Sequence, residues 1–410
     1  EAGDPGVEEL EVSNTRELRS FSYDDRGRLT LSSQQQLSTY GTARYGSSSY
    51  GEISPQSTQG LRLFDYNALD RLKSITFEDG TVLAYSYDNV GNTLSVSETL
   101  AGSSGTNITE YDYFEDNLLD KVRILRDGQI ACEFSHEYDS IGRPSVLKYP
   151  LATGLEAHYE WDSAGRLKSL VYKKNGGDYR KFSYLHDNSG NITQITEVFG
   201  TVTSVSQYEY DWLDRLKVVK KGPTESTTSI RAIYTHDDVD NISKLELPEN
   251  FLEYTFTVGD DDNLLSRIKT DVSSSPAIVF TENFLSDDDG NITKRTRTDG
   301  TDVFKTSYKW NDFGKLIAVS SSLNGSSTDY PKQDNIFGIS GIRRKKIKKD
   351  GQEVNEYTES LSTAVSKSQS GSLSYIRGSQ LLGFETDGSF YYFLTDHLGS
   401  VRDIVRGTDG

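Results

Sequence analysis

The chain has 410 residues and a formal net charge of −18, and only 34% of its residues are hydrophobic. A surface this acidic repels phosphate groups, so the charge argues against nucleic acid as a partner. No run of about 18 apolar residues occurs, so no transmembrane helix is predicted. The one cysteine, Cys132, excludes an intrachain disulfide.

The first expected element is an N-terminal tail over residues 1–20, which lacks the charged and apolar regions of a signal peptide. Because the chain starts at Glu1, we expect it to be a fragment or a processed piece. A repeat region is expected over residues 21–345, and a closing segment over residues 346–410. The chain is therefore predicted to have three parts in this order.

The repeat region is defined by a seven-residue pattern with an aromatic residue first and aspartate second. Residues 23–29 read YDDRGRL, and residues 161–167 read WDSAGRL. The pattern returns about every 24 residues, a period typical of repeat architectures. A degenerate copy is expected near Tyr45, which brings the prediction to about fourteen units. The recognised copies begin at residues 23, 66, 87, 113, 138, 161, 186, 210, 236, 259, 286, 310 and 337.

The fifth position of each copy is glycine, aspartate or asparagine, the residues that tolerate a positive φ. Aromatic residues alternate before this position and an apolar residue follows it, which is the period-2 pattern of strands. Each unit is therefore predicted to be a β-hairpin, and the stacked hairpins an all-β fold with one long coiled sheet. We hypothesise that the first-position aromatic residue and the aromatic residue two positions before it, such as Tyr210 and Tyr208, share one face of the sheet and pack against those of the neighbouring units. The predicted turn glycines are Gly27, Gly91, Gly142, Gly165, Gly190, Gly290 and Gly314.

Other architectures share part of this pattern. Leucine-rich repeats have a similar period but need L-x-x-L-x-L rows, which this chain lacks. Choline- and glucan-binding solenoids combine aromatic residues and glycine at a similar repeat length, so they stay open as a second choice. A sandwich of unrelated hairpins is disfavoured because so many copies keep one spacing.

The Y-D-x-x-G-R-L and Y-D-x-x-G-N copies resemble the YD repeats of RHS proteins, a superfamily that includes teneurins and the shell subunits of insecticidal toxin complexes. Residues 391–402 read YYFLTDHLGSVR, which resembles the RHS core signature of an aromatic run followed by D-H-L-G-S. The resemblance covers about residues 20–410, nearly the whole chain. The residues that match the signature are Tyr391, Tyr392, Asp396, His397, Leu398, Gly399 and Ser400.

This resemblance implies a continuous sheet coiled into a shell around the protein's own variable C-terminal polypeptide, often a toxin. It implies a scaffold and not an enzyme, which encapsulates, protects and delivers that cargo, with a secretion or delivery component as a second partner. It also implies a bacterial protein that is secreted or lies at the cell surface. In many members a self-cleaving Asp-rich motif follows the core signature, and Gly410 precedes any such motif here.

Two functions of other classes stay open beside the shell. One is adhesion or glycan binding at a cell surface, with carbohydrate bound through exposed aromatic residues. The other is an aspartyl autoprotease carried by the wall itself, which would need the motif beyond Gly410. The sequence that the gene encodes after this residue would distinguish these functions from encapsulation, because a toxin-like tail supports encapsulation and a wall anchor supports adhesion.

No phosphate-binding loop, zinc spacing or nucleophile elbow occurs, so no catalytic residue, cofactor or metal ligand is predicted. The acidic runs at residues 260–262 and 287–289 lack the ligand spacing of an EF-hand, so we interpret them as turn residues of the repeat. The basic run at residues 343–349 is interpreted as a solvated edge strand protected by lysines. The alternative for this run is docking of an acidic partner or a membrane surface.

Two pairs of residues could suggest chemistry but favour structural roles. Cys132 with His136 could form a nucleophile and its base, yet a lone cysteine is most often a small buried hydrophobe. Asp396 and His397 form an acid–base pair in sequence, yet neighbours on a strand point to opposite faces. The regular pattern weakens after Leu316, and the closing segment is expected to fold back and cover the sheet edge there.

Overall fold

The chain is described by a computed structural model, in which it forms β-strands almost throughout. Three short 3-10 helices, η1 (Leu151–Thr153), η2 (Glu225–Thr227) and η3 (Pro248–Asn250), occur in the described residues, and no α-helix. The structure describes residues 15–38, 54–78, 80–102, 105–259, 263–299, 301–311, 314–324, 330–337, 343–348, 353–357, 365–368, 371–377, 381–386 and 388–407.

The described residues contain 32 strands, which join into one sheet. The first sixteen are β1 (Thr15–Tyr23), β2 (Leu29–Ser38), β3 (Ser54–Tyr66), β4 (Leu72–Phe77), β5 (Val82–Tyr87), β6 (Thr93–Thr99), β7 (Thr106–Tyr113), β8 (Leu119–Arg126), β9 (Gln129–Tyr138), β10 (Pro144–Lys148), β11 (Leu155–Trp161), β12 (Leu167–Lys174), β13 (Gly177–His186), β14 (Ile192–Phe199), β15 (Val202–Tyr210) and β16 (Leu216–Gly222). The others are β17 (Ser229–His236), β18 (Ile242–Leu247), β19 (Leu252–Val258), β20 (Leu264–Asp271), β21 (Ile278–Ser286), β22 (Ile292–Asp299), β23 (Asp302–Trp310), β24 (Leu316–Leu323), β25 (Tyr330–Phe337), β26 (Arg343–Lys348), β27 (Glu353–Tyr357), β28 (Val365–Ser368), β29 (Gly371–Arg377), β30 (Leu381–Thr386), β31 (Ser389–Thr395) and β32 (Val401–Arg406).

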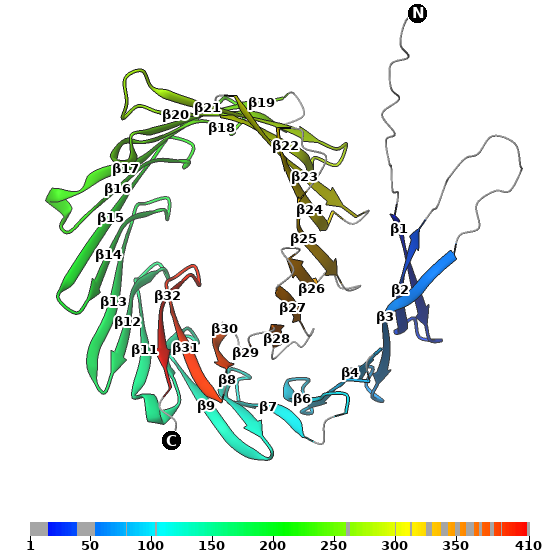
Figure 1. The fold of residues 1–410 in the computed structure, drawn as a ribbon. Coiled ribbons are helices and arrows are strands. Elements are labelled where there is room, and N and C mark those ends of the chain that lie inside the picture. Colours follow the sequence, from blue (N-terminus) through cyan, green and yellow to red (C-terminus); the bar gives the residue numbers. More distant parts are fainter. Residues whose placement is uncertain are drawn as a thin grey trace, which may run out of the picture.

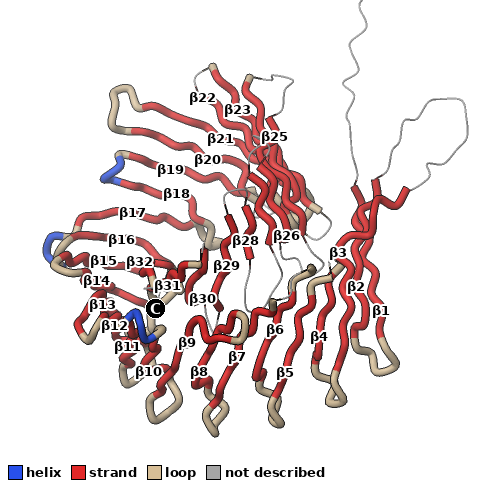
Figure 2. Tube along the Cα trace, turned by 60° about the horizontal axis from the view of Figure 1, so that its bottom comes forward, coloured by secondary structure: helices blue, strands red, loops and turns tan. Residues whose placement is uncertain are grey.

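Every strand pairs antiparallel with the next strand in the chain, so the sheet is a continuous meander. Strand twist makes such a sheet coil. Figure 1 shows the wall curving round from β4 to β28, after which β29–β32 turn inside the coil and lie against β8–β13. Figure 2 shows the same strands lying side by side. The predicted all-β fold of stacked hairpins in one long coiled sheet is confirmed.

The two faces of the sheet differ in chemistry. On β8, Val122 and Ile124 are fully buried on the concave face, and Arg123 between them points outward. The Arg123 Nε donates to Glu133 at 2.9 Å on the outer face, and Lys168 of β12 pairs there with Glu160 of β11. Alternation of apolar and charged side chains thus gives this part of the wall an apolar inner surface and an outer surface of ion pairs.

Several predicted boundaries differ from the structure. Strand β1 begins at Thr15, inside the range predicted as a tail, because its residues pair with β2. The predicted boundary between repeats and closing segment at residues 345–346 falls within β26. The degenerate unit predicted near Tyr45 lies outside the described residues. The strands before and after it in the chain, β2 and β3, pair directly with one another.

Candidate functional site

The aspartate at the second position organises each repeat turn. In the unit that begins at Trp161, the Asp162 Oδ1 accepts hydrogen bonds from the backbone N–H groups of Ala164 and Arg166, both at 2.9 Å. Its Oδ2 accepts the Arg166 Nε at 2.8 Å. These bonds, led by the one from the Arg166 backbone, lower the pKa of the Asp162 carboxyl below its ordinary value. The aspartate therefore accepts hydrogen bonds from backbone N–H groups of this five-residue turn that would otherwise bind water.

The fifth position of the turn has a left-handed backbone. The Gly165 N–H donates to the Asp162 carbonyl at 3.0 Å, which closes the turn. This geometry explains why glycine alternates there with aspartate and asparagine, since other residues rarely adopt a positive φ. The predicted turn glycines have φ values of +75° (Gly27), +109° (Gly91), +82° (Gly142), +81° (Gly165), +96° (Gly190), +81° (Gly290) and +64° (Gly314), and Asp70, Asn117, Asp214 and Asp240 are also at positive φ.

One predicted unit is displaced by a residue. The Gly259 N–H donates to the Asn263 carbonyl at 2.9 Å, the bond that the second-position residue makes in the other units. The sheet register agrees, because Val258 pairs with Leu264. The unit therefore begins at Val258, and the predicted start at Gly259 was wrong. This unit has neither the aromatic residue nor the aspartate that fixes the register elsewhere.

The aromatic residue at the first position links each unit to the one before it. The Tyr138 hydroxyl donates to the Leu119 carbonyl at 2.9 Å, and the Tyr210 hydroxyl donates to the Ile192 carbonyl at 2.8 Å. Trp161 occupies the same position and donates its indole Nε1–H to the Pro144 carbonyl at 2.8 Å. A ring with a donor at its far end is therefore what this position requires.

Replacing Tyr138 by phenylalanine should lower the free energy of unfolding by about 1 kcal/mol, because the Leu119 carbonyl loses its donor. Urea unfolding followed by tryptophan fluorescence measures the change. Tyr138→Trp is the control, because the indole donates in the unit that begins at Trp161. Equal losses in both variants would mean that ring packing, and not the hydrogen bond, matters at this position.

Arginine and asparagine at the sixth position connect the units in the opposite direction. The Arg71 Nη1 donates to the Asp88 carbonyl at 2.7 Å, and its guanidinium stacks 4.9 Å from the Tyr87 ring centroid. The Asn92 Nδ2 reaches the Asn117 Oδ1 at 2.9 Å in the next unit. These contacts repeat along one rim, so neighbouring turns stabilise one another, as expected for a repeat array.

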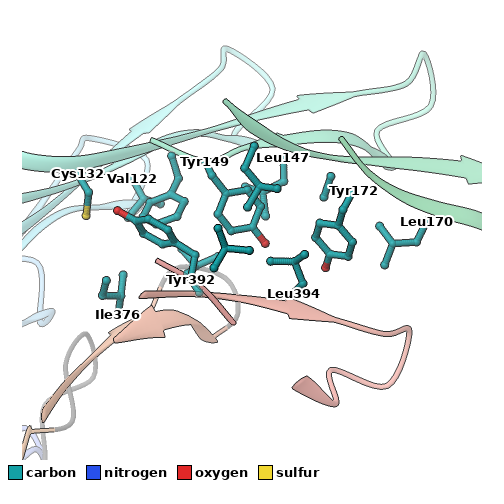
Figure 3. Packing of buried hydrophobic residues seen from close by; sticks show 14 of the residues in the cluster. Val122, Cys132, Leu147, Tyr149, Leu170, Tyr172, Ile376, Tyr392 and Leu394 are labelled. Atoms are coloured by element: carbon teal, nitrogen blue, oxygen red, sulfur yellow. The ribbon is translucent and has the colours of Figure 1, made fainter. Parts of the chain in front are cut away.

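The closing segment packs on the concave face of the wall with a large buried cluster between them (Figure 3). The rings of Phe134, Tyr149 and Tyr392 meet edge to face, with centroids 5.8 to 6.0 Å apart. The closing segment contributes Ile376, Leu382, Tyr392, Leu394 and Val405. The wall contributes Val122, Ile124, Cys132, Phe134, Leu147, Tyr149, Leu155, Ala157, Leu170, Tyr172, Phe182 and Tyr184.

Wall tyrosines also bind the backbone of the closing segment. The Tyr149 hydroxyl donates to the Phe393 carbonyl at 3.1 Å, and the Tyr172 hydroxyl donates to the Thr395 carbonyl at 3.0 Å while accepting the Thr395 N–H. Burial raises the pKa of Tyr172 above its ordinary value, so its hydroxyl keeps its proton. These polar contacts fix the register of β31 on the wall, which apolar packing alone would leave less defined.

Charged groups complete the docking surface at its two sides. Arg126 of β8 pairs with Glu385 of β30 at 3.2 Å. Arg180 of β13 lies 3.5 Å from Asp403 of β32, which also accepts the Tyr179 hydroxyl. The closing segment therefore brings carboxylates to arginines of the concave face. The predicted fold-back differs from this arrangement, because the segment covers a face and not an edge, and the edge of β24 is paired with β25.

The D-H-L-G-S residues form another turn of the repeat type. The Asp396 Oδ1 accepts the N–H groups of Leu398 and Ser400 at 2.9 and 3.0 Å, and its Oδ2 accepts the Arg402 Nε at 2.8 Å. Gly399 is at φ +77° in the left-handed region. The argument from strand alternation for Asp396 and His397 was therefore wrong, because both residues lie in a turn. The pattern T-D-H-L-G-S-V matched the repeat apart from its missing first aromatic residue.

The two tyrosines of the signature point to opposite sides of β31. Tyr392 is buried against the wall, whereas Tyr391 stacks on Phe384 with centroids 4.8 Å apart. Leu398 is 77% exposed at the tip of the turn. The Asp396 side chain is only 3% exposed. The signature thus holds a buried hydrogen-bonded turn against the wall.

A small cavity of about 230 Å³ lies between this turn and the wall. It is lined by His136, Tyr159 and Trp161 of the wall and by Asp396 and His397 of the turn. The His397 ring meets the Tyr184 ring edge to face with centroids 4.9 Å apart. Burial lowers the pKa of His397, and the arginine and histidine nearby lower it further against the opposing effect of Asp396.

The docked turn should loosen at acid pH. A histidine whose pKa is lowered on folding favours the neutral form, so its contribution is complete above the unfolded value of about 6.5 and declines as pH falls below it. Relative to its cleavage of an unfolded peptide at the same pH, trypsin should therefore cut the closing segment faster at pH 5.5 than at pH 7.5. His397→Asn should reduce this pH dependence, and an unchanged ratio of cleavage rates would assign the effect elsewhere, first to the buried His136.

Cys132 lies in the buried cluster and is 3% exposed. Burial raises the pKa of its thiol to about 12, which keeps it protonated at neutral pH. The His136 Nδ1 lies 3.4 Å from the Asp120 carbonyl. The geometry therefore places this cysteine with the apolar side chains of the wall.

The remaining charged runs have structural positions. The Asp287 Oδ1 accepts the N–H groups of Asp289 and Asn291, as in the other repeat turns. Residues 260–262 lie outside the described residues, and within those described no group of three or more potential metal ligands occurs. Residues 343–348 of the basic run form β26, which pairs with β25 and β27, so the predicted edge strand was wrong. No helix in the described part of the chain could span a membrane.

The fold and the docked signature define a class of protein, a coiled β-repeat wall with its last hairpins inside. The family model described as Teneurin YD-shell matches residues 156–410, and the model described as RHS Repeat matches residues 66–104. The chain therefore belongs to the teneurin YD-shell family, and the resemblance to RHS and YD-repeat proteins is confirmed.

Two curated relatives are similar over part of the chain. The tRNA3(Ser)-specific nuclease WapA of Bacillus spizizenii is 31% identical over 192 residues, and the tRNA nuclease WapA of Bacillus subtilis is 32% identical over 174 residues. The matches cover 47% and 42% of this chain but 7% and 6% of those proteins. This chain therefore spans a small part of the length of its relatives.

Solved structures whose chain path is similar include the crystal structure of TcdB2-TccC3-TEV, with a TM-score of 0.45 and 13% identity. That match covers 95% of this chain and 26% of the other. The Photorhabdus luminescens Tc holotoxin pore matches with a TM-score of 0.42 and 14% identity, over 95% of this chain and 25% of the other.

Proposed function

We propose that this chain is a non-catalytic wall that encloses, protects and delivers a polypeptide, namely the protein's own C-terminal polypeptide. The observation that carries this proposal is the position of β29–β32 inside the coil. A segment of the chain already lies on the concave face there, held by a buried cluster and by tyrosine hydroxyls. The wall therefore holds one stretch of polypeptide on this face already, which is what enclosure of a further stretch requires.

The chemistry of the signature supports a role in holding rather than in cleaving. The Asp396 carboxylate accepts hydrogen bonds from two backbone N–H groups and from Arg402, and the Cys132 thiol is protonated and buried. Two relatives are named as tRNA nucleases, and a toxic nuclease is a cargo that its producer would need to keep enclosed. We therefore assign the wall to enclosure and any such activity to a cargo.

The proposal also includes a division of labour and a place of action. Residues 21–345 would build most of the wall, and residues 346–410 would close it from inside. A secreted or cell-surface location in bacteria suits a protein that carries cargo out of its producer, and a secretion or delivery component would then bind the outside of the wall.

Protease protection tests enclosure. The protein is produced together with the sequence that its gene encodes after Gly410, and trypsin cleavage of that sequence is compared with cleavage of the same sequence alone. Enclosure should slow cleavage at least about tenfold, since access then requires opening of the wall. Equal cleavage rates would reject the proposal. Negative-stain images of the same sample should show a ring or a curved wall, whereas a straight rod would favour adhesion.

A further inference from the structure

The concave face outside the closing segment has a different character along β19–β23. Four cationic side chains, Arg267, Lys269, Arg295 and Arg297, project from β20 and β22 there, and we name them the basic patch. This patch is unexpected in a chain with a net charge of −18.

The register of the sheet places the basic patch on the concave face. Directly opposed residues of antiparallel neighbours point to the same side. The buried Tyr184, which faces the closing segment, sets the side on β13. Opposed pairs on neighbouring strands, joined by residues two apart on one strand, then place the basic patch on the same face as Tyr184. The pairs are Tyr184–Ile195, Ile195–Ser206, Tyr208–Val219, Val219–Ala232, Tyr234–Leu245, Leu245–Tyr254, Tyr254–Lys269, Phe256–Arg267, Arg267–Glu282 and Glu282–Arg297.

Aromatic rings hold the cations in place. Lys269 lies 5.4 Å and Arg297 lies 5.1 Å from the centroid of Phe280. Arg297 also lies 5.6 Å from the Phe304 ring, and Arg267 lies 5.6 Å from the Tyr254 ring. Such contacts order a long cationic side chain without neutralising its charge.

Two carboxylates share this face of the sheet with the four cations: Glu282, which lies beneath them, and Asp271, whose carboxylate interacts with the positive charge of Lys269. Glu282 is 6% exposed and accepts from the Arg267 Nε at 2.6 Å and from the Arg295 Nη2 at 2.5 Å. Both arginines are about one-third exposed, so they can donate further hydrogen bonds on the open side. Four cations against these two carboxylates leave this part of the concave face with a net positive charge.

The covered part of the same face shows how such charges are satisfied. Arg126 and Arg180 on the concave face of β8 and β13 pair with Glu385 and Asp403 of the closing segment. Where a segment lies on this face, it supplies carboxylates to the arginines and aromatic residues to the rings. The basic patch presents the same two groups, arginines and rings, and β29–β32 lie away from it, against β8–β13, in Figure 1.

We propose that the basic patch binds an acidic segment of polypeptide, one with aspartate or glutamate interleaved with apolar residues, laid across β19–β23. This inference rests on the proposed function, because it names the chemistry of the enclosed polypeptide at one place on the wall. Nucleic acid is the rival occupant, and the repulsion of its phosphates by the rest of this acidic chain disfavours it.

Fluorescence anisotropy with a labelled twelve-residue peptide tests the proposal on the whole 410-residue chain. The acidic peptide alternates Glu and Asp with Leu and Tyr, and its partner peptide carries Lys in place of the acids. The acidic peptide should bind in preference, and binding should weaken as salt rises. The variant Lys269→Gln with Arg297→Gln should weaken binding at least about tenfold while leaving the Glu282 ion pairs in place.

The matched control is the double variant Lys294→Gln with Lys305→Gln, in which Lys269 and Arg297 are unchanged. Lys294 and Lys305 lie next to the basic patch on β22 and β23 but point to the outer face, and this variant loses the same charge. It should change binding less than about twofold, in keeping with the small effect of outward charges. Equal weakening by the two variants would overturn the proposal, and so would the absence of any preference for the acidic peptide over its lysine partner by the unmodified chain.

A twelve-nucleotide single-stranded DNA measures the rival occupant, and tighter binding of this DNA than of the acidic peptide would also overturn the proposal. Protease protection of the enclosed polypeptide separates the two claims. Protection without acidic-peptide binding would reject the basic patch and leave enclosure standing. Peptide binding without protection would support the basic patch and reject enclosure.

Discussion

Replacement of Tyr392 by alanine is expected to release the closing segment from the wall and to lower the free energy of unfolding by about 3–5 kcal/mol. Tyr392 is 2% exposed, and its ring meets Phe134 and Tyr149 edge to face. Truncation would leave a cavity at the centre of the cluster and break aromatic contacts that add to the buried area. Urea unfolding measures the loss, and trypsin cleavage within residues 389–407 measures the release.

Tyr391→Ala is the control for this change, because Tyr391 belongs to the same strand and is partly exposed on its other face. It stacks on Phe384 and makes no part of the buried cluster. Its loss should cost clearly less and leave the segment protected from trypsin. Comparable losses in both variants would show that β31 is held by its own hairpin and not by the wall.

The fold could be predicted from sequence because its rules are local. The Asp162 carboxylate, the left-handed Gly165 and the Trp161 donor all act within one unit or between neighbours. A pattern of about 24 residues therefore reports the whole hairpin array. The displaced start at Gly259 shows the limit, because a unit without its marker residues has no local signal of register.

The docking of the closing segment could not be predicted in the same way. Tyr172 meets Thr395 across more than half of the chain, and no spacing rule reports a contact between units so far apart. One signal was present. Tyr149 and Tyr172 occupy the twelfth position of their units, where the next two units, which begin at His186 and Tyr210, have Glu197 and Lys221. An aromatic or apolar residue at this position is only a partial signal of the covered face, because Phe77 and Leu247 hold the same position in units away from the closing segment.

Replacement of Asp396 by alanine is expected to cost about 2–4 kcal/mol, the second large effect on the closing segment. The change leaves the N–H groups of Leu398 and Ser400 without their acceptor, and Arg402 without its partner. The side chain is 3% exposed, so water cannot easily replace these bonds. Asp396→Asn should retain part of the stability, since the amide oxygen can still accept the two N–H groups.

Asp139→Ala is the matched control for Asp396→Ala, since Asp139 makes the same three kinds of bond to Ile141 and Arg143 in an open turn. Its side chain is 25% exposed, so water can take over the freed donors and the urea midpoint should fall less. A larger fall for Asp396→Ala, with faster cleavage of residues 389–407, would show that a repeat turn becomes a latch when it is buried. Equal falls would mean that the signature turn is an ordinary turn of the array, and that the cluster around Tyr392 alone holds the closing segment.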